Sequence, residues 1–524
     1  SDATILEMLG VSQYETGNED GAIENLTNAE AKGASSLALY SSRGKAYYSK
    51  KDWSNANTDL GKANEMGSDD KDVLANLGNA RFRLEDFTGA ISAYDKAITL
   101  GANDEIIYNN RGKAKQNGGD MSGAIADYDK SLSINPEYDR AIENRGIAKY
   151  EQKDYAGAIQ DLSKLTSVGK ATADTYLFLG VSYYKTEDYA ATIDNITTAL
   201  SKGSQDKLAY YARGNALFFT ADYEKALPDL KKAIDLGETD QQTWLSSATS
   251  KYMLEKFESC IYDYDRAAEM GANSAELFHN RGHAKYETKD YDGALSDMDK
   301  AIASDPTYGS AYYYRGNSRF RDKNYNGAIS DYDNAIANGE ATYLVYNNRG
   351  KAKQTLEQYE PAIADFGEAI KLKDDYSKAF ENRAETYFIL ENYTEVVKDV
   401  SSYEKLEEEP DVELLFKRAE AHYNLKQFPL ALSYYDKSIT GGIKDGQAYF
   451  HRGLVMIETE DYTDAIADFD EALKNGPTAE IYMNRALANI HIENYRAAMQ
   501  DLDGAIGLDD QNADAYYNRA LIKE

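Results

Sequence analysis

Apolar and polar positions follow a helical period along the chain, and they do so in paired segments. In residues 309–337, Tyr312, Gly316 and Phe320 recur at a spacing of four, which places them on one face of a helix. The turn-forming cluster DKNYN follows, and a second helical stripe begins at Ala328. The segment therefore predicts two amphipathic helices joined by a short turn.

The same pattern returns every 34 residues. Each copy carries a small residue in its first helix, at Gly10, Gly44, Gly78, Gly112, Gly146, Gly180, Gly214, Ala248, Gly282, Gly316, Gly350, Ala384, Ala419, Gly453, Ala486 and Ala520. The spacing is 34 residues up to Ala384, then lengthens by one at Ala419 and shortens by one at Ala486. Such self-similarity predicts a solenoid of sixteen copies, the last of them cut short.

Other positions of each copy are also restricted. The residue twelve positions after the small residue is alanine in twelve of fifteen full copies, with Thr192, Cys260 and Val396 as the exceptions. An aromatic residue usually opens the second helix, as at Trp53 and Tyr495, and a glycine usually closes it. Small residues allow close helix approach, and glycine is the common residue just after a helix end. Cys260 is therefore predicted to pack in the core.

This arrangement resembles the tetratricopeptide repeat family over the whole chain. The resemblance implies an all-α fold, a right-handed superhelical solenoid of antiparallel helix pairs whose first helices line a concave groove. One solenoid of about fifteen and a half repeats is expected over residues 1–524, with repeats beginning near residues 3, 37, 71, 105, 139, 173, 207, 241, 275, 309, 343, 377, 412, 446, 479 and 513. The family's proline near the repeat end occurs only at Pro136 and Pro306, with Pro477 nearby.

Two charged positions vary together from copy to copy. Ten copies have Arg before the small residue and Asp fifteen residues after it: Arg43/Asp59, Arg111/Asp127, Arg145/Asp161, Arg213/Asp229, Arg281/Asp297, Arg315/Asp331, Arg349/Asp365, Arg383/Asp399, Arg452/Asp468 and Arg485/Asp501. Where Arg becomes Leu, Asp is lost too: Leu9 goes with Asn25, Leu77 with Ala93, and Leu179 with Asn195. The correlation predicts an ion pair within each repeat, although a shared duplication history would produce the same correlation.

Composition narrows the class of function. Lys and Arg total 58 and Asp and Glu total 89, a net charge of −31, which disfavours nucleic acid and favours a basic or amphipathic protein partner. One cysteine excludes an internal disulfide, and no uncharged apolar run approaches the roughly 18 residues of a membrane-spanning helix. No motif for a phosphate loop, a dinucleotide, a serine nucleophile or zinc occurs. No enzyme activity, cofactor or membrane insertion is expected, and the compartment is not indicated.

A candidate groove follows from aromatic residues four positions after the small residue. The groove candidates are Tyr48, Phe82, Tyr150, Tyr184, Phe218, Tyr252, His279, His283, Tyr286 and Phe320. Two interpretations remain open: packing between neighbouring repeats, or a ladder that binds an extended peptide. The family's clamp for a terminal carboxylate needs Lys three positions before the small residue, and Lys never occurs there.

Histidine and asparagine residues raise two further candidates. His279 and His283 lie four apart on one helix, but no third metal ligand is evident, so polar groove residues are expected and metal is not. Asn25, Asn195 and Asn392 begin N-x-T sequons. Glycosylation is relevant there only in an extracellular protein, and packing explains the two asparagines that face leucine.

The two ends and one insertion interrupt the regular pattern. Apolar residues that a further helix would cover lie at Ile5, Leu6 and Leu9 and at Tyr516, Tyr517 and Leu521. The chain is therefore expected to be part of a longer protein, or to associate with itself head to tail. An inserted turn at 405–412, with Pro410, predicts an irregular joint.

Two functions from different classes fit these patterns. The first is a non-catalytic protein–protein interaction scaffold that uses its concave surface. The second is a structural, fibre-forming protein that assembles by end-to-end stacking.

Overall fold

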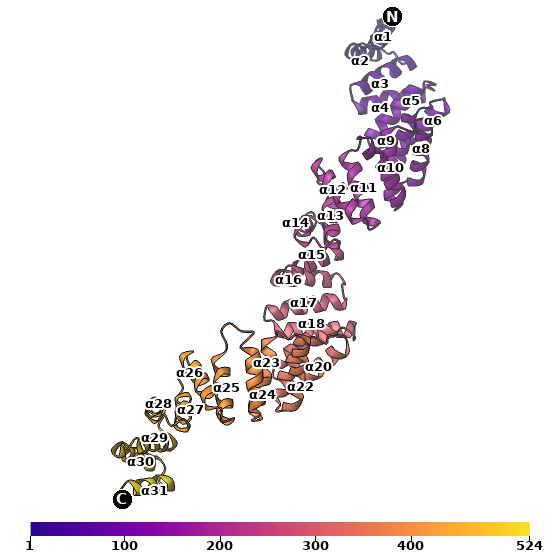
Figure 1. Ribbon diagram of the computed structural model, residues 1–524. Coiled ribbons are helices and arrows are strands. Elements are labelled where there is room, and N and C mark those ends of the chain that lie inside the picture. Colours follow the sequence, from indigo (N-terminus) through magenta and orange to yellow (C-terminus); the bar gives the residue numbers. More distant parts are fainter. Residues whose placement is uncertain (1, 524) are drawn as a thin grey trace. The chain divides into compact units, whose positions relative to one another are not determined.

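The computed structural model describes residues 2–523, and all regular structure within them is α-helical (Figure 1). No strand occurs in this part of the chain, which confirms the predicted all-α fold. None of these helices combines the length and the apolar character that a membrane crossing requires.

The chain divides into two compact units, Ser1–Ala272 and Asn273–Glu524, here called unit 1 and unit 2. Unit 1 contains α1 (Asp2–Glu15), α2 (Glu19–Ala31), α3 (Leu37–Ser49), α4 (Trp53–Glu65), α5 (Lys71–Arg83), α6 (Phe87–Thr99), α7 (Glu105–Asn117), α8 (Met121–Ile134), α9 (Asp139–Glu151), α10 (Tyr155–Ser167), α11 (Ala173–Lys185), α12 (Tyr189–Ser201), α13 (Lys207–Phe219), α14 (Tyr223–Asp235), α15 (Gln241–Met253) and α16 (Phe257–Glu269). Unit 2 contains α17 (Ala275–Glu287), α18 (Tyr291–Ser304), α19 (Gly309–Arg321), α20 (Tyr325–Ala337), α21 (Tyr343–Thr355), α22 (Tyr359–Leu372), α23 (Ser377–Ile389), α24 (Tyr393–Tyr403), α25 (Val412–Asn424), α26 (Phe428–Thr440), α27 (Gly446–Glu458), α28 (Tyr462–Asn475), α29 (Ala479–His491), α30 (Tyr495–Leu508) and α31 (Ala513–Lys523). Within each unit, an odd-numbered helix pairs with the next even-numbered one, and each pair packs on the following pair.

The turn inside each pair requires a left-handed backbone. Lys51 between α3 and α4 has φ 61°, and the equivalent turn residue of other repeats is again Lys, Glu, Ala or Gly with positive φ. Such a conformation costs a non-glycine residue about 1 kcal/mol. The next residue offsets this cost, because Asp52 accepts the backbone N–H of Asn55 at 3.2 Å and caps α4.

The small residue of the first helix permits close approach of the second. A Cβ atom at Gly350 would lie 2.7 Å from the ring of Phe366, closer than carbon atoms can approach. The alanine of the second helix is buried in the same interface, as Ala362 shows. Cys260 occupies this alanine position in its own repeat, and burial raises the pKa of its thiol to about 12.

The longest connection between helices in residues 2–523 joins α24 to α25. α24 ends at Tyr403 and α25 begins at Val412, whereas the other connections span three to five residues. Residues 405–411 of the predicted irregular joint fall in this connection, and the joint's last residue, Val412, begins α25. The hydroxyl of Tyr403 accepts the backbone N–H of Asp411 at 3.3 Å, so the loop folds back on the helix it leaves.

Candidate functional site

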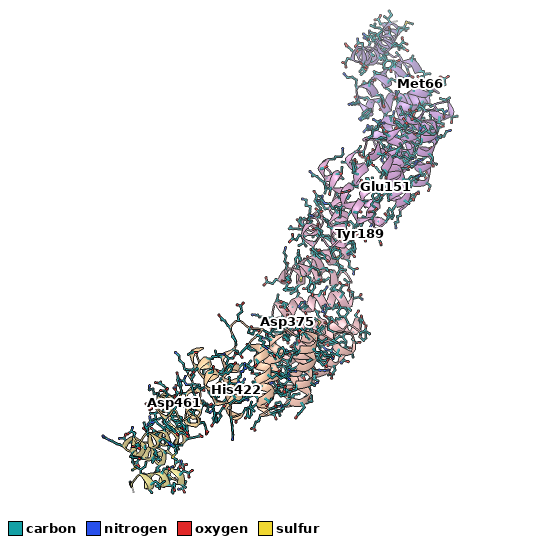
Figure 2. The ribbon with its side chains drawn as sticks, in the orientation of Figure 1. Met66, Glu151, Tyr189, Asp375, His422 and Asp461 are labelled. Atoms are coloured by element: carbon teal, nitrogen blue, oxygen red, sulfur yellow. The ribbon has the colours of Figure 1, made fainter. Side chains whose placement is uncertain are left out.

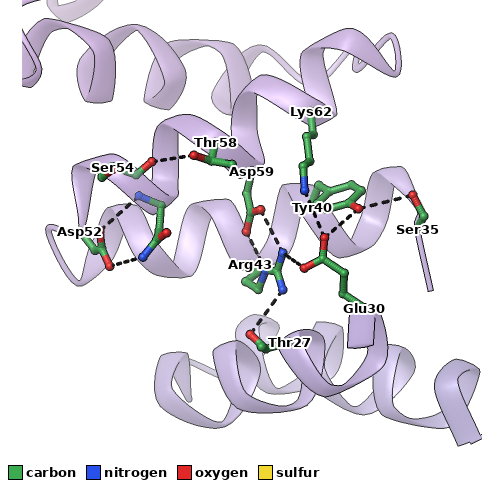
Figure 3. Close-up of polar contacts among 11 residues, drawn as sticks. Thr27, Glu30, Ser35, Tyr40, Arg43, Asp52, Ser54, Thr58, Asp59 and Lys62 are labelled. Carbon is green, nitrogen blue, oxygen red and sulfur yellow. Dashed lines mark hydrogen bonds and ion pairs between the residues drawn. The ribbon is translucent and has the colours of Figure 1, made fainter. Parts of the chain in front are cut away.

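All ten Arg/Asp pairs expected from the sequence are ion pairs within one repeat. Nine have shortest N···O distances of 2.5 to 2.7 Å, and Arg485 with Asp501 forms the tenth. Figure 3 shows the first: Arg43 Nε donates to Asp59 Oδ2 at 2.7 Å, and Nη2 donates to Glu30 at 2.6 Å. The pair joins the two helices of a repeat, and Glu30 adds a link to the preceding repeat.

The carboxylate of Asp331 binds two cations, whereas the sequence predicts one. Arg315 donates to Asp331 through Nε at 3.0 Å and through Nη2 at 2.7 Å, which is the expected contact. Arg319 also donates to Asp331, at 2.8 Å. The prediction of one cation for Asp331 was therefore incomplete, because Arg319 lies one turn after Arg315 on the same face of α19 and reaches the same carboxylate. Asp331 itself is 1% exposed, so its carboxylate is shielded from water.

In the described part of the chain, some of the paired aspartates bind a second cation and others do not, and the pKa values of Asp297 and Asp399 differ accordingly. Lys285 lies 2.9 Å from Asp297, which also binds Arg281. Burial raises the pKa of Asp297, but the hydrogen bonds from Arg281 and Lys285 outweigh burial and hold that pKa below its usual value. Asp399 has Arg383 as its bidentate partner, and among residues 2–523 no second cation is bonded to it; burial raises its pKa.

Several of these arginines also reach the preceding repeat, which the sequence patterns did not reveal. Arg315 Nη1 donates to Asp299 at 2.6 Å, and Arg349 Nη1 donates to Asp333 at 2.6 Å. These aspartates lie two positions after the paired aspartate of their own repeat. Their side chains are about half exposed, so each link contributes at most about 1 kcal/mol.

Two repeats that lack arginine, those of Leu77 and Leu179, replace the ion pair with apolar packing, whereas Ser247 in a third donates to Asp263. Leu77 and Leu179 are buried. Asn195, in the aspartate position opposite Leu179, turns its amide to the backbone oxygen of Ala191 at 2.8 Å. Asn25 donates in the same way to Gly21 and also to the side chain of Gln13.

The groove aromatics contact the aromatic residue five positions later. The ring centroids are 5.3 to 6.3 Å apart in Tyr48–Trp53, Phe82–Phe87, Tyr150–Tyr155, Tyr184–Tyr189, Phe218–Tyr223, Tyr252–Phe257, Tyr286–Tyr291 and Phe320–Tyr325. Tyr189, labelled in Figure 2, also stacks on Phe219 of the next repeat at 4.9 Å. Packing therefore accounts for this aromatic position in general. Four of the residues, Tyr48, Phe82, Tyr286 and Phe320, line pockets in addition.

The two histidines belong to a buried cluster. His279 Nε2 lies 2.9 Å from the hydroxyl of Ser310, and burial lowers its pKa to about 4. His283 packs against the ring of Tyr314 at 4.3 Å between centroids. Among residues 2–523, no three His, Cys, Asp or Glu side chains lie close enough together to hold a metal ion.

Unit 2 holds a pocket of about 520 Å³ on its first helices, called the unit 2 pocket. It is lined by Tyr286, Tyr313, Asn317, Phe320, Arg321, Tyr332, Asn347, Asn348, Lys351, Tyr376, Lys378 and Asn382. Only Tyr332 comes from a second helix, α20. The lining contains three cations and no carboxylate.

A chain of asparagine side chains crosses this pocket from repeat to repeat. Asn382 donates to Asn347 at 2.9 Å, and Asn347 donates to Asn348 at 3.4 Å. Asn348 donates to Asn317 at 3.0 Å, and the same oxygen accepts the hydroxyl of Tyr332 at 2.9 Å. Asn382 is 2% exposed, and no donor within the described part of the chain, residues 2–523, bonds to its side-chain oxygen.

Unit 1 holds a similar pocket of about 330 Å³, called the unit 1 pocket. It is lined by Tyr48, Trp53, Asn79, Phe82, Arg83, Tyr94, Ile106, Asn109, Asn110, Lys113 and Arg140. Its lining also has three cations and no carboxylate.

The unit 1 pocket carries its own asparagine chain. Asn144 donates to Asn109 at 2.9 Å, and Asn109 donates to Asn110 at 3.2 Å. Asn110 donates to Asn79 at 3.0 Å, whose oxygen also accepts the hydroxyl of Tyr94 at 2.7 Å. The sequence patterns did not single out these asparagines. The signal that could have done so is the identical stretch YNNRGKAKQ at 108–116 and 346–354.

The residues proposed for self-association lie on the first and last described helices. Ile5 and Leu9 of α1 are exposed, whereas Leu6 packs against the core of unit 1. In α31, exposed side chains are found at Tyr516, Tyr517 and Leu521. Self-association through these faces stays a prediction.

Stacked antiparallel helix pairs with pockets on the first helices define a helical-repeat protein. Two tetratricopeptide repeat profiles match the chain, one over residues 41–105, 279–341 and 450–513, the other over 106–138, 208–239 and 343–376. Together they cover more than half of the chain, which therefore belongs to the tetratricopeptide repeat family. Members of this family are typically non-catalytic scaffolds for protein interactions. The comparison with curated proteins gave no match.

Several solved structures are similar to parts of this chain. The crystal structure of YrrB, a tetratricopeptide repeat protein with an unusual peptide-binding site, is 20% identical, covers 36% of this chain and 97% of its own, and has a TM-score of 0.34. Yeast Tom70 is 19% identical, with 84% and 98% covered and a TM-score of 0.30. A repeat protein from Parabacteroides merdae is 16% identical, with 48% and 99% covered and a TM-score of 0.32. The family assignment rests on the repeat profiles.

Proposed function

We propose that the chain is a non-catalytic scaffold that binds protein segments on the face formed by the first helices of its repeats. One observation carries the proposal: each unit has an open pocket on this face, lined by aromatic rings and by asparagine amides from successive helices. Apolar walls with a few convergent polar groups are typical of binding sites. The resemblance to the family makes this face the concave one.

Charge sets a general preference for partners. The net charge of −31 favours a basic or amphipathic protein over the surface as a whole. The two pockets are local exceptions, because their linings are cationic.

Site-specific photo-crosslinking in the source cells tests the proposed face. A photoreactive phenylalanine analogue replaces Ile106, an exposed residue of the unit 1 pocket, or Lys378 of the unit 2 pocket. The matched control replaces Tyr262, an exposed residue of the second helix α16. Discrete crosslinked proteins at 106 and 378, and none at 262, are expected. Crosslinks at 262 alone would show that partners bind the face formed by the second helices.

Self-association into fibres is the second candidate, favoured by the exposed Tyr517 and Leu521 on α31 and Ile5 on α1. Light scattering over a concentration and salt series tests it. Growth that Leu521→Asp suppresses would support fibres, whereas a monomer under every condition would exclude them. Because like charges repel at low salt, assembly is expected to increase as salt is added.

A further inference from the structure

We infer that the two pockets are copies of one binding site, and that each takes an extended peptide segment bearing acidic side chains, so that one chain binds two such segments. The inference rests on the proposed scaffold function and adds the ligand class and the number of sites.

Most lining residues of the two pockets occupy corresponding positions. Each unit 2 residue named below lies 238 positions, or seven repeats, after its counterpart in unit 1. Nine pairs line both pockets: Tyr48 and Tyr286, Asn79 and Asn317, Phe82 and Phe320, Arg83 and Arg321, Tyr94 and Tyr332, Asn109 and Asn347, Asn110 and Asn348, Lys113 and Lys351, and Arg140 and Lys378. Two further pairs, Trp53 with Tyr291 and Asn144 with Asn382, have only their first and only their second member, respectively, in a pocket lining. The position of Tyr48 and Phe82 is aromatic in most copies of the repeat, but the asparagines and cations of this set do not recur in most copies, so the shared polar residues indicate one recognition task performed twice.

The asparagine chain suits an extended main chain. An asparagine side chain offers a donor and an acceptor, the same pair that a peptide unit offers. The hydrogen bonds between the asparagines hold their amides in one orientation within each pocket. The buried oxygen of Asn382 has no donor in the structure, and leaving a buried acceptor unpaired costs about 1 to 3 kcal/mol. An N–H group of a peptide in the unit 2 pocket would remove this cost.

The cations select an acidic segment. In the unit 1 pocket, Arg83, Lys113 and Arg140 make no ion pair with any carboxylate of residues 2–523. Lys113 is partly buried, which lowers its pKa, and an anionic ligand group would stabilise its charged form.

The unit 2 pocket holds the same three charges with more internal partners. Lys351 lies 3.3 Å from Glu385, and Lys378 lies 2.5 Å from Glu381. The guanidinium of Arg321 lies 3.5 Å from the ring centroid of Tyr291. Because Glu385 and Glu381 partly neutralise the two lysines, the excess positive charge of the unit 2 pocket comes mainly from Arg321. An acidic segment is therefore expected to bind there less strongly than in the unit 1 pocket.

Selection of a random peptide library displayed on phage, with the full chain as bait, tests the inference. Enriched peptides are expected to be rich in Asp and Glu and to bind at two per chain in isothermal titration calorimetry. Asn110→Ala and Asn348→Ala should each reduce the number to one, since each removes the central amide of one asparagine chain. A peptide selected on the Asn348→Ala chain should also bind the Asn110→Ala chain, because the two sites are copies.

Asn484→Ala is the matched control, because Asn484 has the same position in its repeat but bonds only within its own helix, to Glu480. It should leave two sites. The exposed rim cations give variants that do not disturb the core: Arg140→Glu and Lys378→Glu should each weaken its own site about tenfold or more, with unchanged helix content by circular dichroism.

Three other outcomes overturn the inference. Enrichment of basic or neutral peptides would reject the ligand class. Acidic peptides that still bind at two per chain after both asparagines are replaced would reject the sites, while the scaffold proposal stands. A selection that enriches no peptide at all would reject the inference, and the crosslinking result then decides the scaffold proposal separately.

Discussion

The two units carry corresponding pockets but differ in how the two helices of a repeat are held together. In unit 1, Leu9, Leu77, Leu179 and Ser247 take the arginine position in four repeats. In unit 2 every repeat has arginine: Arg281, Arg315, Arg349, Arg383, Arg418, Arg452, Arg485 and Arg519. Even the copy without the paired aspartate keeps its arginine engaged, because Arg418 binds Glu404 and lies over the ring of Tyr434 at 4.2 Å.

This difference shows that the interface between the two helices tolerates either chemistry. A buried leucine and a buried ion pair can have similar net stability, because the attraction between the charges is offset by the loss of their hydration. Removing one partner alone is different, because the remaining charge is stranded. Stability therefore depends mainly on whether the residues at the two positions match each other, and less on which residue occupies either position.

Stranding a charge in unit 2 should have the largest effect. Arg383→Leu leaves Asp399, which is 1% exposed, without its bidentate partner, and should lower the free energy of unfolding by about 3 to 5 kcal/mol. The double variant Arg383→Leu/Asp399→Asn copies the Leu179/Asn195 arrangement of unit 1 and should recover most of this loss. Urea denaturation and hydrogen exchange in α23 and α24 measure both. Equal losses in the single and double variants would show that the pair is not coupled.

The reverse exchange in unit 1 should have a somewhat smaller effect. Leu77→Arg buries an unpaired charge at a fully buried position and should cost about 3 kcal/mol. Adding Ala93→Asp recreates the ion pair and should restore stability to within about 1 kcal/mol of the wild type. Leu77→Met is the control of similar volume, with an expected cost below about 1.5 kcal/mol. A double variant no more stable than Leu77→Arg would show that unit 1 cannot accommodate the ion pair.

The two pockets share their asparagine chains but differ in the side chains of their walls. Tyr313 lines the unit 2 pocket, and its counterpart in unit 1 is Ala75, which lines a separate space of about 160 Å³. Tyr313→Ala should weaken the selected peptide at the unit 2 pocket by about 1 kcal/mol, or about fivefold. Calorimetry in the Asn110→Ala background, where the unit 1 site is disabled, isolates this effect. Unchanged affinity would place the peptide away from Tyr313.

The smallest expected effect is that of acid on stability, which should differ between Asp297, which binds Lys285 as well as arginine, and Asp399, which binds arginine. The pKa of Asp297 lies below the usual 3.8, so its stabilisation is present above that pH and is lost as the pH falls through its folded-state pKa. The pKa of Asp399 lies above 3.8, so its contribution is greatest below that pH and is lost as the pH rises through its folded-state pKa.

The unfolding free energies of Asp297→Asn and Asp399→Asn, each compared with the wild type at about pH 6 and about pH 3, measure these contributions. On acidification the wild type should lose stability relative to Asp297→Asn and gain stability relative to Asp399→Asn, by about 1 kcal/mol or less in each case. If the stability differences of both variants from the wild type changed with pH in the same direction, the second cation, Lys285, would not explain the different pKa shifts of Asp297 and Asp399.

The sequence predicted those features that lie within one repeat. Gly350 and Ala362 could be placed at a close helix contact, and Arg349 could be paired with Asp365, because a short turn fixes the register of two adjacent helices. The aromatic position left packing and groove open. The structure shows that Tyr48 takes part in both, since it packs on Trp53 and also lines the unit 1 pocket.

The full set of partners around one aspartate was less predictable. Pairing Asp331 with Arg315 needed only the correlation between copies, whereas the second hydrogen bond from Arg319 depends on how far that side chain extends across the helix pair. Basic residues at the same position recur as Lys285 and Lys353, and each of them also binds the aspartate of its own repeat. This recurrence is the signal that could have predicted the second cation.

Contacts between repeats could not be predicted in the same way. Asp333 looks like any exposed helix residue in the sequence, and only the packing of α20 against α21 brings it to Arg349. Likewise, Asn317, Asn348 and Asn382 stand on three different helices, and each one alone is an ordinary polar residue.

Helical periodicity and the offsets within a single helix pair were sufficient for the all-α fold, the 34-residue repeat and the ion pairs of ten repeats, because these features recur in most copies. The three-dimensional packing was needed to learn which side chains of neighbouring repeats meet, how large the pockets are and which amide remains unpaired. The physical reason is that those contacts depend on the rotation and translation from one helix pair to the next, which many interface residues set together and no single spacing in the sequence encodes.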